Sequence, residues 1–392
     1  MYNGSVVADS SRPVSSPANL TPTFATLGVA HDLVRVLERS GISEPFPIQA
    51  MTLPDAIAGR DVCGKAQTGS GKTLAFGLAV VQRTRRAQPR RPQSLILVPT
   101  RELANQVATV LAPYAGARNL RLSAIYGGVS MVRQIQALRA GLDLVVATPG
   151  RLNDLLDRGE VSVAEVEQVV LDEADQMADM GFLPQVERIL RRIKGRPQTL
   201  LFSATLDDAV QGLVKRYQHD PVRHDVISAT ATVESLEQRF VAVAAADKVR
   251  LAASLVRDTA RALIFVRTQR GAERLAKQLA LEGVNVGRIH GRLSQSQRER
   301  VLAAFTAGTV PVLVATNVAA RGLHVDDISI VVHYDLPDDY KTYIHRSGRT
   351  ARAGASGQVV TLVEPQAAGD ASRLQRAAGI RRAVAEMAPS RS

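Results

Sequence analysis

Short apolar runs alternate with longer amphipathic stretches along most of the chain. The apolar runs cover residues 95–98, 144–146, 169–171 and 200–202 in the first half, and residues 263–266, 312–314 and 330–332 in the second half. Each run has the length and continuous apolar character of a strand that is buried on both faces. The alternation therefore predicts an α/β fold in which helices cover both faces of parallel sheets.

The alternation pauses once, at residues 219–233, where the sequence HDPVRHDVISATATV has little periodicity. A chain of 392 residues also exceeds the length of about 250–300 residues at which a single core stops growing. We therefore predict two domains, at residues 23–220 and 235–366, joined by a linker at residues 221–234. Residues 1–22 are expected to form a disordered tail, and residues 367–392 a short basic tail with one short helix.

The chain is strongly basic, with 49 Lys and Arg against 37 Asp and Glu and a net charge of +12. Such an excess favours a polyanionic partner, because phosphate groups are its usual counter-charge. A basic surface that only keeps the protein soluble is the alternative. Aromatic residues make up 4% of the chain and Trp is absent, so we expect contacts to a nucleic-acid backbone rather than many base-stacking side chains.

The sequence predicts neither a membrane segment nor a secretory signal. No stretch approaches the roughly 20 apolar residues of a membrane span, and the N-terminus lacks a basic start followed by an apolar core. Cys63 is the only cysteine, which excludes an intramolecular disulfide and a cysteine-based metal site. These features predict a cytoplasmic protein without a membrane partner.

The clearest candidate for chemistry is the segment AQTGSGKT, which consists of Ala66, Gln67, Thr68, Gly69, Ser70, Gly71, Lys72 and Thr73. A glycine-rich loop between a strand and a helix holds phosphates with its backbone amides and the helix N-terminus. Lys72 is expected to reach the terminal phosphates, and Thr73 to bind the magnesium ion of the nucleotide. The loop departs from the usual pattern at Ala66, where glycine is expected.

A second candidate is the segment VVLDEAD at residues 169–175, an apolar run that ends in carboxylates. Asp172 is placed at the carboxyl end of the predicted strand, where it can hold the magnesium ion that Thr73 also contacts. Glu173 is placed to polarise an attacking water molecule. An acidic cluster alone is more often a solvated turn or a helix cap, but the buried strand before it favours catalysis of hydrolysis.

A third candidate is the basic segment HRSGRTAR at residues 345–352. Arg349 and Arg352 are three residues apart, so a helix would project both side chains from one face. Two guanidinium groups directed at a transferring phosphate stabilise the charge of its transition state. The alternative is a surface patch that binds RNA or nothing, but Gly348 beside the arginines permits a close approach and favours the catalytic role.

These motifs and several others follow the order found in DEAD-box RNA helicases, which the chain resembles from residue 24 to residue 363. The further matches are GISEPFPIQ at 41–49, PTREL at 99–103, GG at 127–128, TPGR at 148–151, SAT at 203–205, LIFVRT at 263–268, QSQR at 295–298 and VATNVAARGL at 314–323. The resemblance implies two tandem RecA-like domains and an ATP-dependent RNA helicase that hydrolyses Mg-ATP. It further implies RNA-stimulated domain closure, with local, non-processive duplex unwinding or remodelling of RNA–protein complexes.

The resemblance also assigns roles to single residues. In the nucleotide site it implies Phe24, whose ring would stack on adenine, Gln49, which would bond to the edge of the base, Gly322 and His324. For RNA it implies contacts from Pro99, Thr100, Arg101, Gly128, Thr148, Pro149, Gly150 and Arg151 of the first domain and from Arg267, Gln295, Arg298 and Thr316 of the second. Asp175, Ser203, Thr205 and His345 would couple the nucleotide site to domain closure. Hydroxyls, backbone amides and helix N-termini bind phosphates and 2′-hydroxyls without reading bases, so RNA binding should be largely independent of sequence.

The chain departs from the family pattern at Asn317 and His324, where the family usually has Asp, and at Phe46, where many members have Thr. The Asp that His324 replaces normally contacts the ribose of ATP, and a neutral His cannot fully replace its two acceptor oxygens. We expect weaker nucleotide binding or slower turnover rather than loss of activity.

Three other functions share some of these features. A DNA-directed helicase would use the same two-domain engine, and an RNA-binding clamp or assembly factor with weak ATPase activity would fit the changes at Asn317 and His324. A P-loop ATPase without a nucleic acid would fit the phosphate loop alone. The resemblance leaves the RNA open, with ribosome assembly and mRNA decay as candidate settings, and a monomer is expected because one chain carries both halves of the site.

Overall fold

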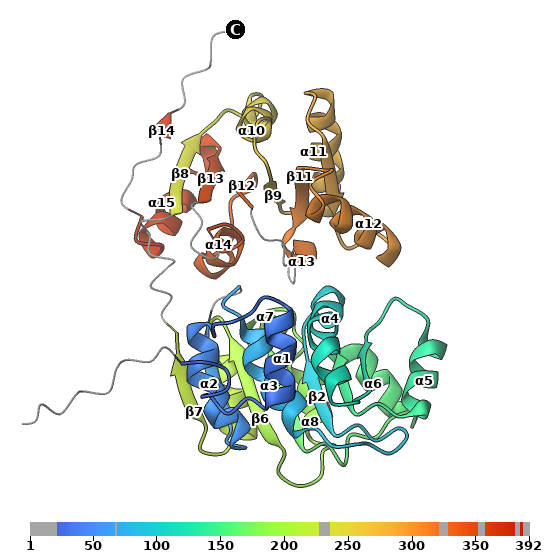
Figure 1. Ribbon diagram of the computed structural model, residues 1–392. Helices are drawn as coiled ribbons and strands as arrows, with labels where there is room; N and C mark the ends of the chain where they lie inside the picture. Colours follow the sequence, from blue (N-terminus) through green and yellow to red (C-terminus); the bar gives the residue numbers. More distant parts are fainter. Residues whose placement is uncertain are drawn as a thin grey trace, which may run out of the picture.

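The computed structural model describes residues 22–66, 69–226, 236–320, 328–351, 357–380 and 385–386. These residues form two α/β domains, one above the other in Figure 1, and each domain is built on one seven-stranded sheet. Across these described ranges, we find no helix with both the length and the apolar character that crossing a membrane requires.

The first domain has the strand order β3-β4-β2-β5-β6-β1-β7, and all neighbouring strands are parallel. Its strands are β1 (Val62–Lys65), β2 (Ser94–Leu97), β3 (Leu122–Ile125), β4 (Leu144–Ala147), β5 (Gln168–Asp172), β6 (Gln198–Ser203) and β7 (Val222–Asp225). Its helices are α1 (His31–Arg39), α2 (Pro47–Ile57), α3 (Lys72–Arg83), α4 (Arg101–Ala117), α5 (Met131–Ala140), α6 (Pro149–Asp157), α7 (Ala174–Asp179), α8 (Leu183–Leu190) and α9 (Asp208–Tyr217).

The second domain has the strand order β10-β11-β9-β12-β13-β8-β14, again with parallel neighbours. Its strands are β8 (Leu236–Ala242), β9 (Ala262–Val266), β10 (Val286–Ile289), β11 (Val312–Thr316), β12 (Ile330–His333), β13 (Gly357–Val363) and β14 (Ala385–Glu386). Its helices are α10 (Lys248–Val256), α11 (Gln269–Leu281), α12 (Gln295–Thr306), α13 (Asn317–Ala320), α14 (Tyr340–Ser347), the 3₁₀ turn η1 (Pro365–Ala367) and α15 (Ala368–Ala377). The predicted fold, two α/β domains with parallel sheets, is confirmed.

Both domains extend beyond the predicted boundaries. Strand β7 lies inside the range predicted as linker, yet it pairs with β1 from Val222 to Asp225 and completes the first sheet. Helix α15 follows residue 366, the predicted end of the second domain, but buries Ala371 and Leu374 in that domain's core. The sequence of α15 is Ala- and Arg-rich, so only its few buried residues indicate that the helix packs on the second domain.

The central strands are buried on both faces because helices cover each sheet on both sides. In β2, Leu95 and Leu97 belong to one hydrophobic cluster, while Ile96 and the following Val98 belong to the cluster on the opposite face. Successive side chains of a strand point to opposite faces, so a strand between two helical layers must be apolar throughout.

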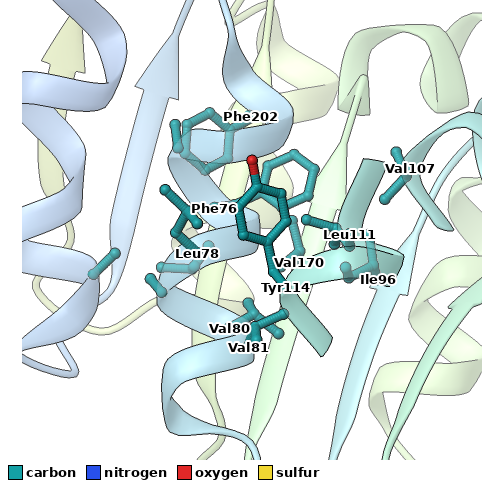
Figure 2. Close-up of a cluster of buried hydrophobic side chains, with 14 of the residues drawn as sticks. Phe76, Leu78, Val80, Val81, Ile96, Val107, Leu111, Tyr114, Val170 and Phe202 are labelled. Atoms are coloured by element: carbon teal, nitrogen blue, oxygen red, sulfur yellow. The ribbon is translucent and has the colours of Figure 1, made fainter. Parts of the chain in front are cut away.

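Helix α3 packs closely against α4 on one face of the first sheet (Figure 2). A Cβ atom on Gly77 of α3 would overlap Cδ2 of Leu111 in α4. The rings of Phe76 in α3 and Phe202 in β6 lie beside this contact, with their centroids 5.5 Å apart. Because α3 begins at Lys72, this packing also holds the start of the helix that follows the glycine-rich loop.

We predict that Gly77→Ala destabilises the first domain by about 1–3 kcal/mol, because the added methyl group overpacks the contact between α3 and α4. Helix propensity alone predicts the opposite sign, since Ala is the better helix former by about 1 kcal/mol. A loss of stability would therefore report the close contact. Gly116 in α4 is a matched control, because a Cβ atom there meets nothing within 4 Å. Gly116→Ala should therefore be neutral or stabilising. Urea unfolding measures both variants, and a Gly77→Ala protein as stable as Gly116→Ala would contradict the close contact.

Candidate active site

The motif loops of the first domain lie at one edge of its sheet, because all its strands are parallel and their carboxyl ends share that edge. The segments AQTGSGKT, DEAD and SAT follow β1, β5 and β6, which are adjacent in the sheet. The segments PTREL, GG and TPGR follow β2, β3 and β4, which are also adjacent. Because of this strand order, the predicted nucleotide residues and the predicted RNA residues form two separate groups at the carboxyl ends of the strands. Ligands of α/β folds bind at these strand ends.

The glycine-rich loop needs glycine at two positions. Gly69 has φ +89° and Gly71 has φ +84°, both in the left-handed region. At Gly71 space is also limited, because a Cβ atom would lie 2.5 Å from Nε2 of Gln49 and 2.5 Å from Cδ2 of Phe46. Gln49 donates from Nε2 to the carbonyl oxygen of Gly71 (2.9 Å) and accepts from the N–H of Phe46 through Oε1 (2.8 Å). The structure therefore brings Gln49 to the loop, as its predicted role requires.

Lys72 is the first residue of α3, and its side chain contacts the start of the glycine-rich loop. Its side chain is buried, and Nζ donates to the carbonyl oxygen of Ala66 at 3.0 Å. Ala66 is held in turn by its own N–H, which donates to the carbonyl oxygen of Ser203 at 3.0 Å. Ser70 and Thr73 are half-buried. Five further residues predicted for the site, Gln67, Thr68, Gly322, His324 and Arg352, lie outside the described residues.

Asp172 ends β5 as a buried carboxylate, and its Oδ1 accepts from the N–H of Glu173 at 3.0 Å. Burial raises its pKa to about 7, with Glu173 and Asp175 adding to the rise and the positive charge of Lys72 opposing it. The electrostatic influence of Lys72 shows that the structure brings the loop lysine and the strand-end carboxylate together. When burial disfavours the ionised form of a carboxylate in this way, a nearby cation stabilises that ionised form.

Glu173 has an unusual backbone conformation, with φ 52° and ψ 50°. For a residue other than glycine this left-handed conformation costs about 1–3 kcal/mol and is typical of functional sites. The side chain is 4% exposed, and Oε2 has no hydrogen-bond partner among the described residues. A buried carboxylate oxygen without a partner fits the predicted contact to an attacking water molecule.

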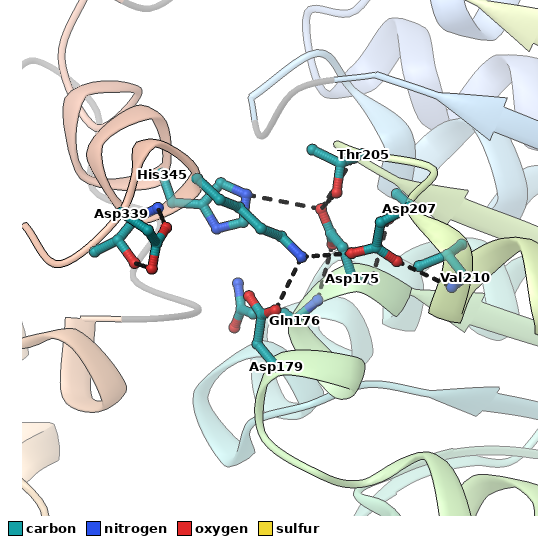
Figure 3. Close-up of polar contacts among 11 residues, drawn as sticks. Asp175, Gln176, Asp179, Thr205, Asp207, Val210, Asp339 and His345 are labelled. Atoms are coloured by element: carbon teal, nitrogen blue, oxygen red, sulfur yellow. Dashed lines mark hydrogen bonds and ion pairs between the residues drawn. The ribbon is translucent and has the colours of Figure 1, made fainter. Parts of the chain in front are cut away.

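Asp175 is buried and is the centre of a network that contains all four residues predicted to couple the nucleotide site to closure. Figure 3 shows the contacts of Asp175 with Thr205 and His345. Oδ2 of Asp175 accepts from the N–H and the hydroxyl of Thr205 at 3.0 and 3.1 Å, and the N–H of Asp175 donates to Oγ of Ser203 at 3.1 Å. His345 of the second domain places Nε2 3.7 Å from Oδ2 of Asp175. Burial lowers the pKa of His345, and the charge of Asp175 opposes that shift. The residues meet as expected, and their coupling role stays a prediction.

Among its described residues, the basic segment of the second domain is helical only in its first part. Helix α14 ends at Ser347, Gly348 follows as its C-cap, and Ala351 has φ 55°. Arg349 is therefore outside the helix, so the condition under which the two arginines would share one helical face is not met at Arg349. Arg349 is nevertheless buried, and its charge contributes to lowering the pKa of His345, which places it near the coupling network.

Phe24 does not lie where a base could stack on it. Its side chain is 2% exposed and packs in the main hydrophobic cluster of the first domain. The stacking role predicted for Phe24 is therefore not supported, because spacing along the chain carried no information about burial. The exposed ring beside the glycine-rich loop belongs to Phe46, which is 51% exposed.

The predicted RNA residues of the first domain lie at the N-termini of two helices and in one loop. Thr100 caps α4, since its Oγ1 accepts from the N–H of Leu103 at 3.2 Å, and Thr148 precedes α6. The guanidinium group of Arg101 packs against Gly128, where a Cβ atom would collide with it. Pro99 precedes the cap of α4, and Pro149, Gly150 and Arg151 begin α6. Helix N-termini and a loop glycine of this kind bind phosphates well.

The second domain contributes residues at the ends of its own strands. Thr316 ends β11, Arg267 follows β9, and Gln295 begins α12. Arg298 has a partner in the first domain, because its Nε donates to Oε1 of Glu102 at 2.8 Å. This ion pair is largely shielded from solvent, with side-chain exposures of 13% and 10%. Arg298 therefore contacts the other domain, while its RNA contact stays a prediction.

Sequence reasoning missed several charged residues, some inside the second domain and some between the two domains. Arg346 is buried and donates from Nε to Oδ1 of Asn317 at 2.7 Å, with its guanidinium group 5.2 Å from the centroid of the Phe265 ring. Burial lowers the pKa of Arg346 to about 10. Glu102, Asp207 and Lys341 were also missed; the one available signal was that Lys341 is among only seven lysines of an Arg-rich chain.

Two family models match most of the chain. The model described as DEAD/DEAH box helicase matches residues 46–213, and the model described as helicase conserved C-terminal domain matches residues 247–354. The DEAD-box ATP-dependent RNA helicase CshA of Geobacillus kaustophilus is 39% identical over 90% of this chain and 76% of that protein. The ATP-dependent RNA helicase CshA of Listeria monocytogenes is 40% identical over 88% of this chain and 67% of that protein.

Solved structures of related helicases share the fold. The structure of S. cerevisiae Dbp5 bound to RNA and ADP BeF3 is similar with a TM-score of 0.83 and 30% identity, covering 93% of this chain and 95% of that chain. The structure of Mss116p bound to ssRNA and AMP-PNP has a TM-score of 0.82 and 27% identity, covering 95% of this chain and 81% of that chain. Sequence relatives, family models and fold agree with the geometry of the site. The chain belongs to the DEAD-box family of ATP-dependent RNA helicases.

Proposed function

We propose that this ATP-dependent RNA helicase works by closing its two domains around Mg-ATP and RNA, and that closure separates short duplexes locally without processive movement. The observation that carries the proposal is the approach of His345 in the second domain to Asp175 of the DEAD segment, at 3.7 Å. The overall arrangement gives further support, because the two relatives named above, with TM-scores of 0.83 and 0.82, were both determined with RNA and a nucleotide or its analogue.

In the proposed site, each polar group of the first domain has one task. Lys72 binds the terminal phosphates, and the hydroxyl of Thr73 and the carboxylate of Asp172 hold magnesium, partly through water. Magnesium, when bound, neutralises charge on the phosphates. Glu173 orients the attacking water molecule and accepts its proton through the unpartnered Oε2.

The second domain completes this site only when it approaches the first. Arg349 and Arg352 stabilise the negative charge that develops on the transferring phosphate. Asp175 transmits the approach, because its hydrogen bonds join the start of α7 to the end of β6 and the loop after it. Glu173 is two residues from Asp175, so a shift of this network moves the catalytic carboxylate. Ligands that bind the closed arrangement more tightly would thereby increase its population.

RNA binding uses the other half of the sheet edge. The N-termini of α4 and α6 and the loop at Gly128 contact phosphates and 2′-hydroxyls, with further contacts from the second domain. Recognition is then independent of sequence, which suits a cytoplasmic monomer that acts on RNA in ribosomal or mRNA-decay assemblies. Hydrolysis reopens the domains and releases the RNA.

We predict that ATP hydrolysis is stimulated by RNA and not by DNA of identical sequence, because the proposed contacts include 2′-hydroxyl groups. Phosphate release is measured with no nucleic acid, with RNA and with DNA. Equal stimulation by both would favour a DNA-directed helicase, and turnover that is unaffected by either would favour an ATPase without a nucleic-acid partner.

We predict that Glu173→Gln lowers RNA-stimulated ATP hydrolysis by at least about 100-fold, because the amide cannot accept the proton of the attacking water. Mg-ATP binding should persist, since the residues proposed to hold phosphate and metal are unchanged. A single-turnover hydrolysis assay and an equilibrium binding assay separate the two effects. Glu165→Gln, at a half-exposed position of the same domain, is the control; similar turnover by both variants would remove Glu173 from the reaction.

We predict that His324→Asp lowers the KM for ATP, because a carboxylate restores the paired acceptor oxygens that the family places near the ribose. Steady-state hydrolysis at saturating RNA measures the effect. An unchanged KM would remove His324 from the nucleotide site.

A further inference from the structure

We infer that Lys341 is a latch between the domains, a positioning residue that stabilises the closed arrangement through two carboxylates of the first domain. The inference rests on the proposed closure mechanism and adds to it a contribution to closure that requires neither ATP nor RNA.

The contact joins one ammonium group to two helices of the other domain (Figure 3). Nζ of Lys341, near the start of α14, donates to Oδ1 of Asp179 at 2.9 Å and to Oδ2 of Asp207 at 2.7 Å. Asp179 is the last residue of α7, and Asp207 directly precedes α9. A single side chain of the second domain therefore binds the first domain at two separate elements.

The groups are partly shielded from water, which distinguishes them from ordinary surface pairs. The side-chain exposures are 28% for Lys341, 25% for Asp179 and 38% for Asp207. Exposed ion pairs contribute little because water and salt screen them. Charge-assisted hydrogen bonds at these distances in a partly buried contact are stronger.

The charges of the latch are maintained by the contact itself. Burial alone would lower the pKa of Lys341, but the hydrogen bonds to Asp207 and Asp179 outweigh it and raise that pKa. Burial alone would raise the pKa of Asp207, but the hydrogen bonds from Lys341 and from the N–H of Val210 hold it below its ordinary value. Both partners are therefore ionised at neutral pH.

The latch lies next to the catalytic contact. Lys341 and His345 are four residues apart in α14, so they lie on the same face of the helix. Lys341 binds the first domain while His345 approaches Asp175. The ion pairs thus hold α14 in the orientation that brings His345, and Arg349 beyond it, to the nucleotide site.

The test measures the ratio of closed to open molecules in the full chain by fluorescence energy transfer. Dyes are attached at Asp154→Cys in α6 and Leu281→Cys in α11, both at exposed positions. The native Cys63 is buried at 1% exposure, so it reacts poorly with the dyes. The ratio is recorded without ligand, with RNA alone, and with RNA plus Mg-AMP-PNP.

Lys341→Ala should lower the closed-to-open ratio about three- to tenfold in every condition, the effect of losing a partly shielded ion-pair cluster. Lys277→Ala, which removes the same charge from an exposed position of α11, should leave the ratio unchanged. A ratio that is the same in Lys341→Ala, Lys277→Ala and the parent protein would overturn the latch.

Exchanging the charges of Lys341 and Asp179 distinguishes loss of the ion pair from indirect effects of the substitution. Lys341→Asp should open the protein more than Lys341→Ala does, because it adds a negative charge beside two carboxylates. Asp179→Lys in the same chain should restore closure. Asp179 is chosen for the exchange because Oδ1 of Asp207 accepts from the N–H of Val210 and caps α9. Absence of any restoration in the Lys341→Asp, Asp179→Lys protein would contradict the proposed pairing.

The same data separate the latch from the proposed function. If RNA plus Mg-AMP-PNP raises the closed fraction but Lys341→Ala has no effect, the latch fails and ligand-driven closure stands. If ligands do not change the closed fraction of the parent protein but Lys341→Ala still lowers it, ligand-driven closure fails and the latch stands.

Discussion

The buried carboxylate of Asp175 joins the parts of the molecule that must work together. Its oxygens accept hydrogen bonds from Gln176 and Thr205, and its N–H donates to Ser203. A carboxylate in this environment is tolerated only because such partners replace water. The same bonds hold the short turn that contains Glu173, whose left-handed backbone persists because the surrounding structure enforces it. The network is thus both a structural requirement of the fold and the point at which His345 of the second domain meets the first.

The order of strands in the sheet, rather than their order along the chain, determines which motifs become neighbours. Strand β1 is far in sequence from β5 and β6, yet it lies next to β6 in the sheet. The loops after β1, β5 and β6 therefore lie together at the predicted nucleotide site, while those after β2, β3 and β4 form a separate group. In a fully parallel sheet every loop at this edge follows a carboxyl end, so the fold gathers six motif segments without any dedicated scaffold.

The elements that could be predicted from the sequence are those whose environment leaves a local signal. Central strands such as β5 are buried on both faces and therefore appear as continuous apolar runs. Edge strands were missed, because β7 (VRHD) and β10 (VGRI) are partly exposed and interrupt the apolar pattern. The glycine-rich loop lies between β1 and α3 and the DEAD segment at the end of β5, as the sequence predicted, since both motifs consist of a few consecutive residues.

Features that depend on distant parts of the chain left no comparable signal. The burial of Phe24, the bond between Arg346 and Asn317, and the pair of Arg298 with Glu102 all arise from packing between separate elements. The break after α14 was equally hidden, since a helix continuing through Gly348 has the same residue spacing as the observed turn.

The covalent connection between Asp225 at the end of β7 and Leu236 at the start of β8 has a consequence for how tightly the two halves of the site must bind each other. A short tether confines one domain to the vicinity of the other, at an effective concentration of about a millimolar. Assembly of the site is then a unimolecular event whose extent does not depend on the amount of protein. Under such confinement, contacts that are far too weak to hold separate subunits together are sufficient to favour the arrangement in which the two domains touch.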